Sequence, residues 1–386
     1  MAKKDMELNN TADDIELEDI DGFDPFDVLD DSYEDNKVYG NSKPSDNRNE
    51  RKNTKKKRKN PVLVWAGRVG ATLLATILML VLFLYSVMAM LVYGPSKTAK
   101  IQFVLSVQET SAIGFLANWF CSQDEIDEIR ANNAIKDTDE ITDAGLVNID
   151  TSAQDPETPD IEIVDVKGAT YSGKLMIVKD PSRLFVGTVP EFTNGNGMVV
   201  ADIAKRYDAI GGVNGGEFVD GDTTYTAMPI GLVMKDGEVL NDNGGTSHVT
   251  GITYDNKLVL GNMNAAKAKE LNIRDCVSIS NHIGPFLIVN GEAQDVVGIA
   301  GGANPRTAIG QTADGKILLL AIDGRQPNSI GASFSDLQDI MAQYGAVNAS
   351  TMDGGTSTQM YYDGEVINVP YSPTGPRSCP TAFLIK

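Results

Sequence analysis

The apolar residues divide the chain into one long uninterrupted stretch and a larger region of short runs. Residues 69–96 contain no charged side chain, and most of them are Leu, Val, Ala, Met or Ile. About 20 apolar residues suffice for a helix to cross a bilayer. The pattern therefore predicts one transmembrane helix within residues 61–95.

A cleaved signal peptide is the alternative interpretation of this stretch. Its apolar part has about 7–15 residues and lies close to the N-terminus, whereas this stretch is longer and follows a segment of about 60 residues. Residues 51–59, RKNTKKKRK, hold seven Lys or Arg and no acid. Because such positive flanks stay in the cytoplasm, we expect a single-pass protein of the cell membrane, with a cytoplasmic N-terminus and an extracellular C-terminal domain.

From residue 161 to residue 386 the apolar runs are short, and many are separated by turn residues. Asp, Asn and Gly accept the positive φ angles of tight hairpins, and five such pairs occur: Asp236-Gly237, Asp255-Asn256, Asn290-Gly291, Asp314-Gly315 and Asp363-Gly364. Helical patterns cover residues 198–207 and 265–271, and a third starts at Ser333 or Ser335 and ends at Gly345. We predict an α+β fold, with a single mixed-sheet extracellular domain and flanking helices over residues 161–386.

The region between the predicted membrane helix and this domain changes character once. Phe115, Leu116, Trp119 and Phe120 recur at helical spacing, and an acidic, Pro-containing stretch follows. Residues 96–160 are therefore predicted to form a helical stalk and an acidic linker. An interfacial helix or a self-association surface are alternatives for residues 100–130, and the oligomeric state is left open.

Charge is distributed unevenly along the chain, whose net charge is −20. Residues 1–50 hold 16 acids against 5 bases and few apolar side chains, so we expect residues 1–60 to be a disordered acidic cytoplasmic tail with a basic juxtamembrane run. The tail is either simply solvated or a docking site for a cytoplasmic partner. The acidity of the exported part argues against nucleic-acid binding.

Cysteine and histidine usage gives no indication of a metal site or of a disulfide scaffold. The three cysteines lack metal-ligand spacing, and a Cys276–Cys379 bridge stays open. Neither His248 nor His282 has a partner at zinc-ligand spacing. We expect no cofactor, although Asp353, Asp323 and nearby carbonyls are groups that a divalent cation accepts.

Three glycine-flanked polar clusters lie at the ends of strand-like runs in the C-terminal region. They are VNGGEF (213–218), NPRTAIG (304–310) and VNASTMDGGTST (347–358), and IDGR (322–325) ends a fourth run. Glycine removes the Cβ and leaves backbone N–H groups approachable by an anion. A site for a charged ligand uses such a pattern, whereas a folding core has little use for it.

With YDG (362–364) and PRSCPTAFLI (376–385), these pieces resemble the phosphodiester glycosidase family in order and spacing over roughly residues 165–386. The resemblance implies cleavage of a sugar from a sugar-1-phosphate diester. Two positions depart from the family pattern. Glu217 replaces the usual aromatic after the glycine pair, and Thr356 replaces a third glycine after the aspartate, so the departures concern the substrate more than the reaction class.

That chemistry assigns roles to the clusters. A phosphate monoester is a good leaving group, so the reaction needs a cradle for the anion and a carboxylate near the anomeric carbon. Asp353 is the first candidate for this catalytic carboxylate and Asp323 the second. Either is alternatively an ordinary turn residue. The predicted substrate-binding residues are Arg306, Asn214, Gly215, Gly216, Glu217, His282, Arg325, Gly354, Gly355, Thr356 and Arg377.

The sequence thus predicts a membrane-anchored extracellular phosphodiester glycosidase that hydrolyses sugar-1-phosphate diester linkages in cell-envelope or exopolysaccharide glycans. Its expected partners are the membrane and such a glycan. An envelope sugar-phosphate transferase and a non-catalytic glycan-binding membrane protein are the alternatives.

Overall fold

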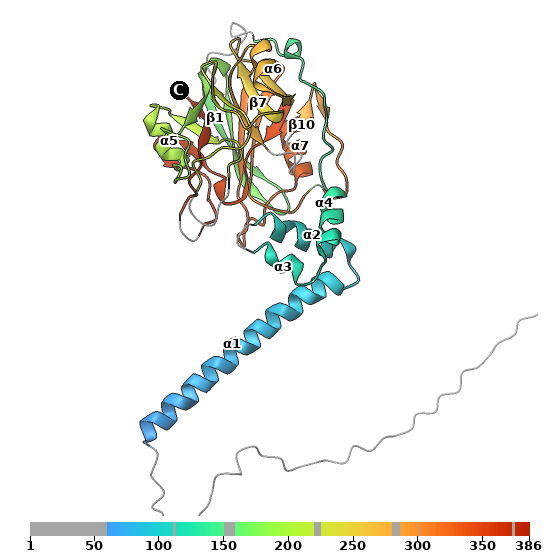
Figure 1. Ribbon diagram of the computed structural model, residues 1–386, viewed down its shortest axis with the longest axis vertical. Helices are drawn as coiled ribbons and strands as arrows, with labels where there is room; N and C mark the ends of the chain where they lie inside the picture. The colour runs from blue at the N-terminus through green and yellow to red at the C-terminus, as the bar shows by residue number, and fades with distance from the viewer. Residues whose placement is uncertain are drawn as a thin grey trace, which may run out of the picture. The chain divides into compact units, whose positions relative to one another are not determined.

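A computed structural model describes residues 60–110, 113–149, 159–219, 225–279, 286–299, 301–372 and 375–386. The acidic tail, the basic run and His282 lie outside the described residues, so the predictions made for them stay predictions. The apolar stretch forms α1 (Pro61–Tyr93), a single uninterrupted helix (Figure 1). Within it, Val64–Tyr93 is long and apolar enough to cross a membrane.

The strands of the described residues form three antiparallel sheets. In the large sheet the order is β1 (Ile161–Lys167), β2 (Ser172–Val178), β13 (Ile317–Ile322), β12 (Arg306–Thr312), β14 (Ala346–Thr351), β10 (Phe286–Val289) and β11 (Glu292–Ala293). In the β4 sheet it is β16 (Glu365–Val366), β15 (Met360–Tyr362), β4 (Gly211–Asn214), β17 (Thr381–Ile385) and β3 (Leu184–Thr188). In the β9 sheet it is β6 (Glu238–Asn241), β5 (Val233–Lys235), β9 (Ile273–Ile279), β7 (Ser247–Thr253) and β8 (Leu258–Met263).

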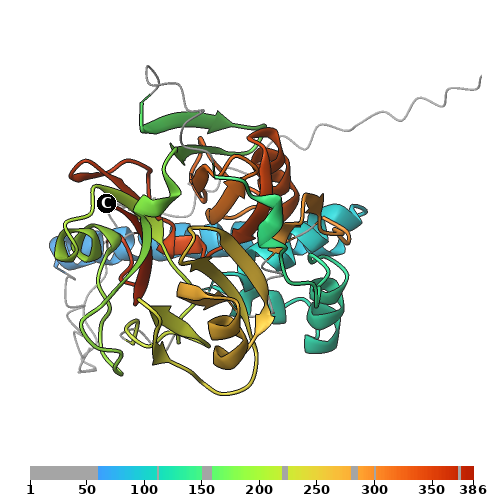
Figure 2. The ribbon, with the colours of Figure 1, turned by 90° about the horizontal axis from the view of Figure 1, so that it is seen from above.

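The five predicted turns each join two neighbouring strands. In the β5–β6 turn Asp236 and Gly237 have φ angles of 51° and 81°, and in the β10–β11 turn Asn290 and Gly291 have 54° and 82°. In the other three hairpins, positive φ angles occur at Asn256, at Gly315 and at both Asp363 and Gly364. Figure 2 shows the β1–β2 hairpin at the margin of the large sheet, where β1 is the edge strand.

The main core lies among the three sheets. Apolar side chains from all of them meet in one buried cluster, with Met176 from the large sheet, Phe383 from the β4 sheet and Val277 from the β9 sheet. Each sheet also carries a helix: α7 (Phe334–Gln343) packs beside β10 and β14 (Figure 1), α5 (Val200–Arg206) packs on the β4 sheet, and α6 (Ala265–Glu270) follows β8. These elements confirm the α+β class.

Helix α7 shows why the local sequence sets an element's bounds. Ser333 is its N-cap, and its hydroxyl accepts a hydrogen bond from the N–H of Asp336 while the Asp336 carboxylate accepts one from the N–H of Ser333. Leu337, Ile340 and Met341 face the core. Gly345, at φ 79°, follows the helix and lets the chain turn into β14.

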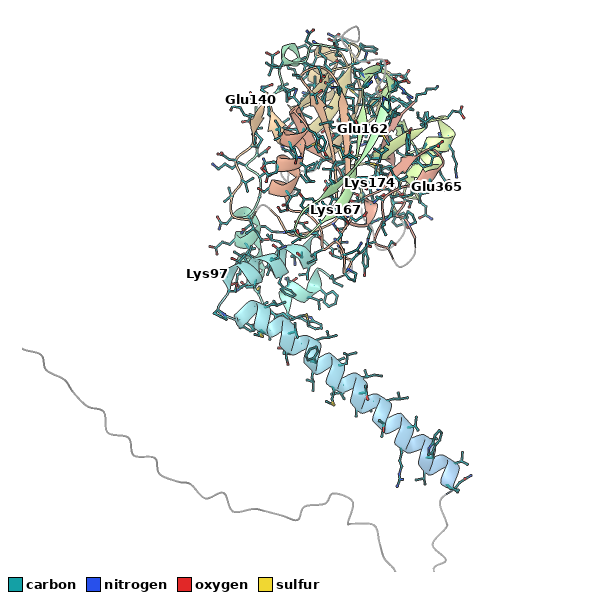
Figure 3. The ribbon with its side chains drawn as sticks, turned by 180° about the vertical axis from the view of Figure 1, so that it is seen from behind. Lys97, Glu140, Glu162, Lys167, Lys174 and Glu365 are labelled. Atoms are coloured by element: carbon teal, nitrogen blue, oxygen red, sulfur yellow. The ribbon has the colours of Figure 1, made fainter. Side chains whose placement is uncertain are left out.

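Three helices follow α1 in place of one continuous stalk helix. They are α2 (Lys97–Gln108), α3 (Phe115–Asn118) and α4 (Gln123–Ala131), and they pack on one another and on the last turns of α1 in a cluster of their own. Lys97, the first residue of α2, is labelled in Figure 3.

Residues 132–149, here named the strap, have little regular structure but are bound to the C-terminal sheets. Ile135 forms a bridge with Val296, and Thr142 exchanges hydrogen bonds with Leu260, one of 3.0 Å through its N–H and one of 2.9 Å through its hydroxyl. Further along, the N–H of Asn148 donates to the carbonyl of Ala313 over 2.8 Å. Glu140 of the strap, labelled in Figure 3, accepts a hydrogen bond from the Asn290 side chain. The region predicted as a linker thus includes a segment that is fixed to the sheets.

Candidate active site

Asp353 lies two residues beyond the end of β14, where the strand leaves the large sheet. Met352 turns into the main core, and Asp353 follows half-buried. Its backbone is held from both sides: its N–H donates to the Gly215 carbonyl over 3.1 Å, and its carbonyl accepts from Asn214 Nδ2 over 2.7 Å. The ends of β14 and β4 therefore meet at this carboxylate.

Asn214 is the residue that joins the surrounding elements. It is fully buried, and its Oδ1 accepts hydrogen bonds from the hydroxyl of Thr307 over 2.8 Å and from the N–H of Gln359 over 3.2 Å. Because Nδ2 donates to Asp353, these hydrogen bonds of the amide are made to β12, to the residues after β14 and to the start of β15. Asn214 was predicted to contact the substrate; the structure instead commits its amide to the protein, which makes it a positioning residue for Asp353.

Gly215 and Gly216 allow a close approach of neighbouring strands. A Cβ on Gly216 would lie 2.3 Å from the Ser278 carbonyl oxygen, and one on Gly215 would lie 2.4 Å from the Thr381 hydroxyl. Both N–H groups have protein acceptors, the carbonyl of Thr381 at 2.9 Å and its hydroxyl at 3.2 Å. The prediction that these N–H groups face an anion is therefore corrected, because the glycines serve packing against β17 and β9.

The pKa of Asp353 is raised to about 7. Burial is the largest cause, and the negative charge of Glu217 adds to it. The Ser357 hydroxyl, the Arg377 guanidinium and the Gly354 N–H act in the opposite direction. A carboxyl that titrates near neutrality is well matched to proton transfer or nucleophilic attack at physiological pH.

Glu217 and Arg377 complete this charged group. Glu217 is half-buried, and its N–H donates to Ser278 over 3.1 Å, which fixes the chain next to β9. The Arg377 guanidinium lies over the Phe218 ring, with 5.0 Å between its Cζ and the ring centroid. Two carboxylates and a guanidinium thus gather at one place. The departure from the family pattern at Glu217 has placed a second acid beside Asp353.

The turn after Asp353 packs against the start of β12. The N–H of Gly355 donates to the Pro305 carbonyl over 2.9 Å, and a Cβ on Gly354 would lie 2.9 Å from the same oxygen. Gly355 has a φ of 63° and lies beside the Arg325 guanidinium, 3.4 Å from the position of a Cβ to Nη2. Thr356 follows, half-buried in the short 3₁₀ helix η4 (Gly355–Ser357).

Arg306 and Arg325 form a second group on the other side of this turn, together with Glu109 from the end of α2. Arg306 is 5% exposed; its Nε donates to the Ala332 carbonyl over 3.2 Å and its Nη2 to the Gly302 carbonyl over 2.8 Å. Nη2 also lies 2.7 Å from Glu109 Oε2. Arg325 donates to the Glu109 carbonyl over 3.2 Å.

Asn304 joins the two halves of this group. Its Nδ2 donates to Glu109 Oε2 over 2.6 Å, and its Oδ1 accepts from Arg325 Nη2 over 3.1 Å. Arg306 was predicted to bind the substrate. The structure instead gives its donors to Glu109 and two carbonyls, and Arg377 is the arginine whose charge lowers the pKa of Asp353.

Asp323 lies at the end of β13 and braces a loop. Its Oδ1 accepts from Asn368 Nδ2 over 3.1 Å and from the Val369 N–H over 2.8 Å, and its carbonyl accepts from the Ser329 hydroxyl over 2.6 Å. Burial raises its pKa against these contacts. Neither aspartate is among the groups that shift the pKa of the other. Asp323, the second candidate for the catalytic carboxylate, thus binds the loop at Asn368 and Val369, and Glu217 is the acid whose charge raises the pKa of Asp353.

Several residues of the site were not singled out from the sequence. Ser357 and Thr358 are each 1% exposed; the Ser357 hydroxyl acts on the Asp353 carboxyl, and the Thr358 hydroxyl has no hydrogen-bond partner within the described part of the chain. The sequence feature that could have indicated them is the run of hydroxyl residues, TST, that follows the glycine pair. Ile330, Val369 and Tyr371 are exposed apolar side chains on the loops around Asp323 and Arg325, and nothing in a local pattern separates them from ordinary surface residues.

The remaining predicted groups lie outside this site. The His248 ring nitrogen Nε2 lies 2.7 Å from Asp137 Oδ1, in a partly buried contact between the strap and β7. Cys276 and Cys379 are both free and buried, so they do not form the bridge that the sequence left open. Within the described ranges, no group of three or more His, Cys, Asp or Glu residues is arranged to hold a metal ion.

Comparison with known proteins places the site within a family. The model of the phosphodiester glycosidase family matches residues 207–386, a range that includes Glu217, Asp353 and Arg377. Residues 207–386 belong to the phosphodiester glycosidase family. The α2–α4 helices, the strap and Glu109 precede the matched phosphodiester glycosidase segment.

Two curated proteins resemble parts of this chain. The mouse N-acetylglucosamine-1-phosphodiester alpha-N-acetylglucosaminidase is 25% identical over 225 residues, which are 53% of this chain and 42% of that protein. An SPbeta prophage-derived uncharacterized protein, YomE, from Bacillus subtilis (strain 168) is 38% identical over 65 residues, 17% of this chain and 10% of the other. The chain spans less than half the length of either relative.

Two solved structures resemble parts of this chain. The catalytic domain of the zebrafish N-acetylglucosamine-1-phosphodiester alpha-N-acetylglucosaminidase, auto-inhibited by its pro-peptide, has a TM-score of 0.49 and 23% identity over 60% of this chain and 85% of the other. A putative exported protein from Burkholderia pseudomallei K96243 has a TM-score of 0.42 and 17% identity over 56% and 74%.

Proposed function

We propose that the protein is a membrane-anchored extracellular hydrolase that cleaves the bond between the anomeric carbon of a sugar and a phosphodiester in cell-envelope or exopolysaccharide glycans. Membership of residues 207–386 in the phosphodiester glycosidase family supports the reaction class. The observation that carries the proposal is Asp353, a half-buried carboxyl with a pKa of about 7, flanked by Glu217 and Arg377.

The leaving group determines what the site has to supply. Cleavage at the anomeric carbon releases a phosphate monoester, which departs without help from a strong general acid. Positive charge then develops on the sugar ring in an oxocarbenium-like transition state. A carboxylate on one side of the ring and a cation beside the phosphate are the two electrostatic contributions that lower this barrier.

Asp353 supplies the carboxylate that faces the anomeric carbon. In its ionised form it either attacks the carbon directly or takes the proton of an attacking water. Direct attack gives a retained anomer and attack by water an inverted one. Burial, to which the charge of Glu217 adds, keeps the Asp353 pKa near neutrality, and Glu217 offers an acceptor for a sugar hydroxyl.

Arg377 is the proposed contact of the phosphate. Its guanidinium is half-buried and held over the Phe218 ring, so it presents a fixed charge next to Asp353. A planar guanidinium matches phosphate oxygens in a bidentate arrangement. The buried Thr358 hydroxyl, which follows the same turn, is available as a further donor to the substrate.

The membrane location rests on α1. The helix is long and apolar enough to cross a bilayer, and the basic residues 51–59 favour a cytoplasmic N-terminus. This topology places the sheets outside the cell, where glycans linked to lipid or wall are assembled and trimmed. The acidic tail, outside the described residues, is then the cytoplasmic end and the docking site for a partner there.

The test uses the full chain in detergent with a nucleotide-activated N-acetylglucosamine, a sugar-α-1-phosphodiester, and NMR to follow free reducing sugar. We expect release by the wild-type chain, a loss of at least a thousandfold in Asp353→Asn, and unchanged release in Asp363→Asn, a matched change in the β15–β16 turn. The first anomer formed shows whether configuration is retained.

Equal turnover by Asp353→Asn would refute the site. Transfer of the intact sugar-phosphate to an acceptor without free sugar would show that the protein is a transferase and not a hydrolase. Binding of the substrate without turnover would show that it is a glycan-binding protein.

A further inference from the structure

An uncharged, aromatic segment joins α2 to α4. From Thr110 to Gln123 the sequence contains no Asp, Glu, Lys or Arg. An apolar segment of this length is too short to span a bilayer and is typical of a core helix or an interfacial segment. The exposed fractions distinguish the two, since Ile113, Phe115 and Trp119 are 40%, 53% and 58% exposed. These three side chains are here named the α3 patch.

The α3 patch is not the inner face of this segment. Ala117, Phe120 and Cys121 point into the cluster formed with α1, α2 and α4, and each is 7% exposed or less. The segment therefore packs against α1, α2 and α4 through the face that carries Ala117, Phe120 and Cys121, and the α3 patch lies on the opposite face. The Phe115 and Trp119 rings pack against each other with their centroids 5.5 Å apart, in an edge arrangement that presents both to the outside.

The α3 patch adjoins the end of the predicted membrane helix. The Phe120 ring packs against Tyr85 of α1, with 5.2 Å between centroids, and the Tyr93 hydroxyl donates to the Phe120 carbonyl over 3.1 Å. Tyr93 is the last residue of α1. In a spanning helix, this end lies at the boundary between the acyl chains and the headgroups, where Trp and other aromatic side chains are enriched.

We propose that Ile113, Phe115 and Trp119 insert into the outer headgroup–acyl boundary of the bilayer that α1 crosses. This inference rests on the proposed membrane anchorage and is independent of the catalytic activity. Because the segment carries no Lys or Arg, its attraction is apolar and does not require anionic lipid. A bilayer fits the α3 patch better than a second copy does, since three half-exposed side chains offer a few hundred Å² at most, against roughly 800 Å² per partner in a stable complex.

The insertion has a consequence for the active site. Glu109, one residue before the uncharged segment, binds Arg306 and Asn304 on the domain. The α3 patch is therefore tied to the turn that carries Gly354 and Gly355 through a short chain of contacts. Burial of Trp119 in the boundary fixes the distance of the glycosidase segment from the membrane and suits a substrate held close to the lipid surface.

The sequence allows a direct measurement, because the chain contains two tryptophans, Trp65 and Trp119. In the Trp65→Phe variant of the full chain, reconstituted in phosphatidylcholine vesicles, all tryptophan emission comes from Trp119. We expect lipids brominated near the headgroup end of the acyl chain to quench this emission more strongly than lipids brominated deep in the chain. Aqueous iodide, a water-soluble quencher, should leave most of the emission unquenched. High salt should not alter the result.

The reciprocal variant, Trp119→Phe, serves as the control. Its emission comes from Trp65, in the second turn of α1, and reports whether α1 is inserted. Quenching of Trp65 by brominated lipid, with Trp119 responding to iodide alone, would overturn the insertion of the α3 patch while leaving the anchor in place. Trp119 emission that responds to neither quencher and changes with protein density would overturn it in favour of self-association. No lipid quenching of either tryptophan would refute the anchorage and the inference together, whatever the catalytic result.

Discussion

Glu109 Oε2 lies 2.7 Å from Arg306 Nη2, which joins the end of α2 to the first residue of β12. Arg306 has almost no exposed surface, and Asn304 and Arg325 bind the same glutamate through its carboxylate and its carbonyl. The contact links a helix that follows the predicted membrane span to the loop that supports Gly354. An arginine that the sequence suggested for substrate is thereby part of the framework.

Loss of this ion pair is expected to destabilise the protein. Glu109→Gln leaves the buried Arg306 guanidinium without its counter-charge, at a cost of about 2 kcal/mol because Glu109 is itself partly exposed. Thermal unfolding should then shift down by roughly 4–8 °C. The same change at Glu128, an exposed residue of α4, should leave Tm within a degree or so. Equal melting of both variants and the wild type would contradict a supporting role for Glu109.

The pH dependence of catalysis should reflect the ionisation of Asp353. Because the ionised form is the reactive one, kcat/KM should rise with pH through an apparent pKa of about 7. Glu217→Gln removes a negative charge and should move this limb to lower pH, whereas Arg377→Met removes a positive charge and should move it to higher pH. A pH series of initial rates for the three proteins measures both shifts. Shifts in the same direction would be incompatible with the electrostatics described here.

The raised pKa of Asp353 also predicts how stability changes with pH. The unfolded carboxyl ionises near its ordinary pKa of about 4 and the folded one near 7. As pH rises between these values, the unfolded chain loses its proton first, so the wild type loses stability. Asp353→Asn cannot ionise, and its advantage in unfolding free energy over the wild type should grow from pH 5 to pH 8, by no more than about 4 kcal/mol.

Melting curves across that pH range test the stability prediction. The matched variant Asp363→Asn, at an exposed turn position with a φ of 47° that Asn also accepts, should show a constant offset from the wild type. An Asp353→Asn advantage that shrinks as pH rises would mean that the folded pKa of this carboxyl is not raised.

Asn214 is expected to affect the rate more than substrate binding. Asn214→Ala removes the hydrogen bond to the Asp353 carbonyl and leaves Thr307 and the Gln359 N–H without their acceptor, so kcat should fall by one to two orders of magnitude while KM changes little. The control is Asn264→Ala, which removes the N-cap of α6 and should cost about 1 kcal/mol of stability without lowering kcat. Similar kcat values for the two variants would assign Asn214 to folding alone.

Much of the local structure could be predicted from the sequence because its causes are local. Asp236-Gly237 and Asn290-Gly291 form the expected hairpins since the residues that adopt positive φ lie in the turn itself. Ser333 caps α7 for the same reason, through a partner three residues away. The short apolar runs that flank these turns form strands as expected, for example β13 (Ile317–Ile322) after the Asp314-Gly315 turn.

The site could be predicted only in part, because its contacts are long-range. Asp353 follows from its motif, but nothing in the sequence indicates that Glu217 rather than Asp323 accompanies it, since that depends on which strands pair. Glu109 and Asn304 are 195 residues apart, and the polarity of Glu109 at the end of a short helix gives no sign of a partner. Likewise, the arrangement of the strands into separate sheets is set by packing between distant segments, which periodicity does not report.

The strap limits how far the active site can reach. A free chain of 30 residues has a root-mean-square end-to-end distance of about 30 Å, and a domain on such a tether would sample a wide volume above its anchor. Because Ile135, Thr142 and Asn148 are held to the sheets, the strap does not act as a free tether of this length. A chain anchored by α1 would therefore meet substrates within a thin layer at the membrane and at high effective concentration, and would miss those farther out in the wall.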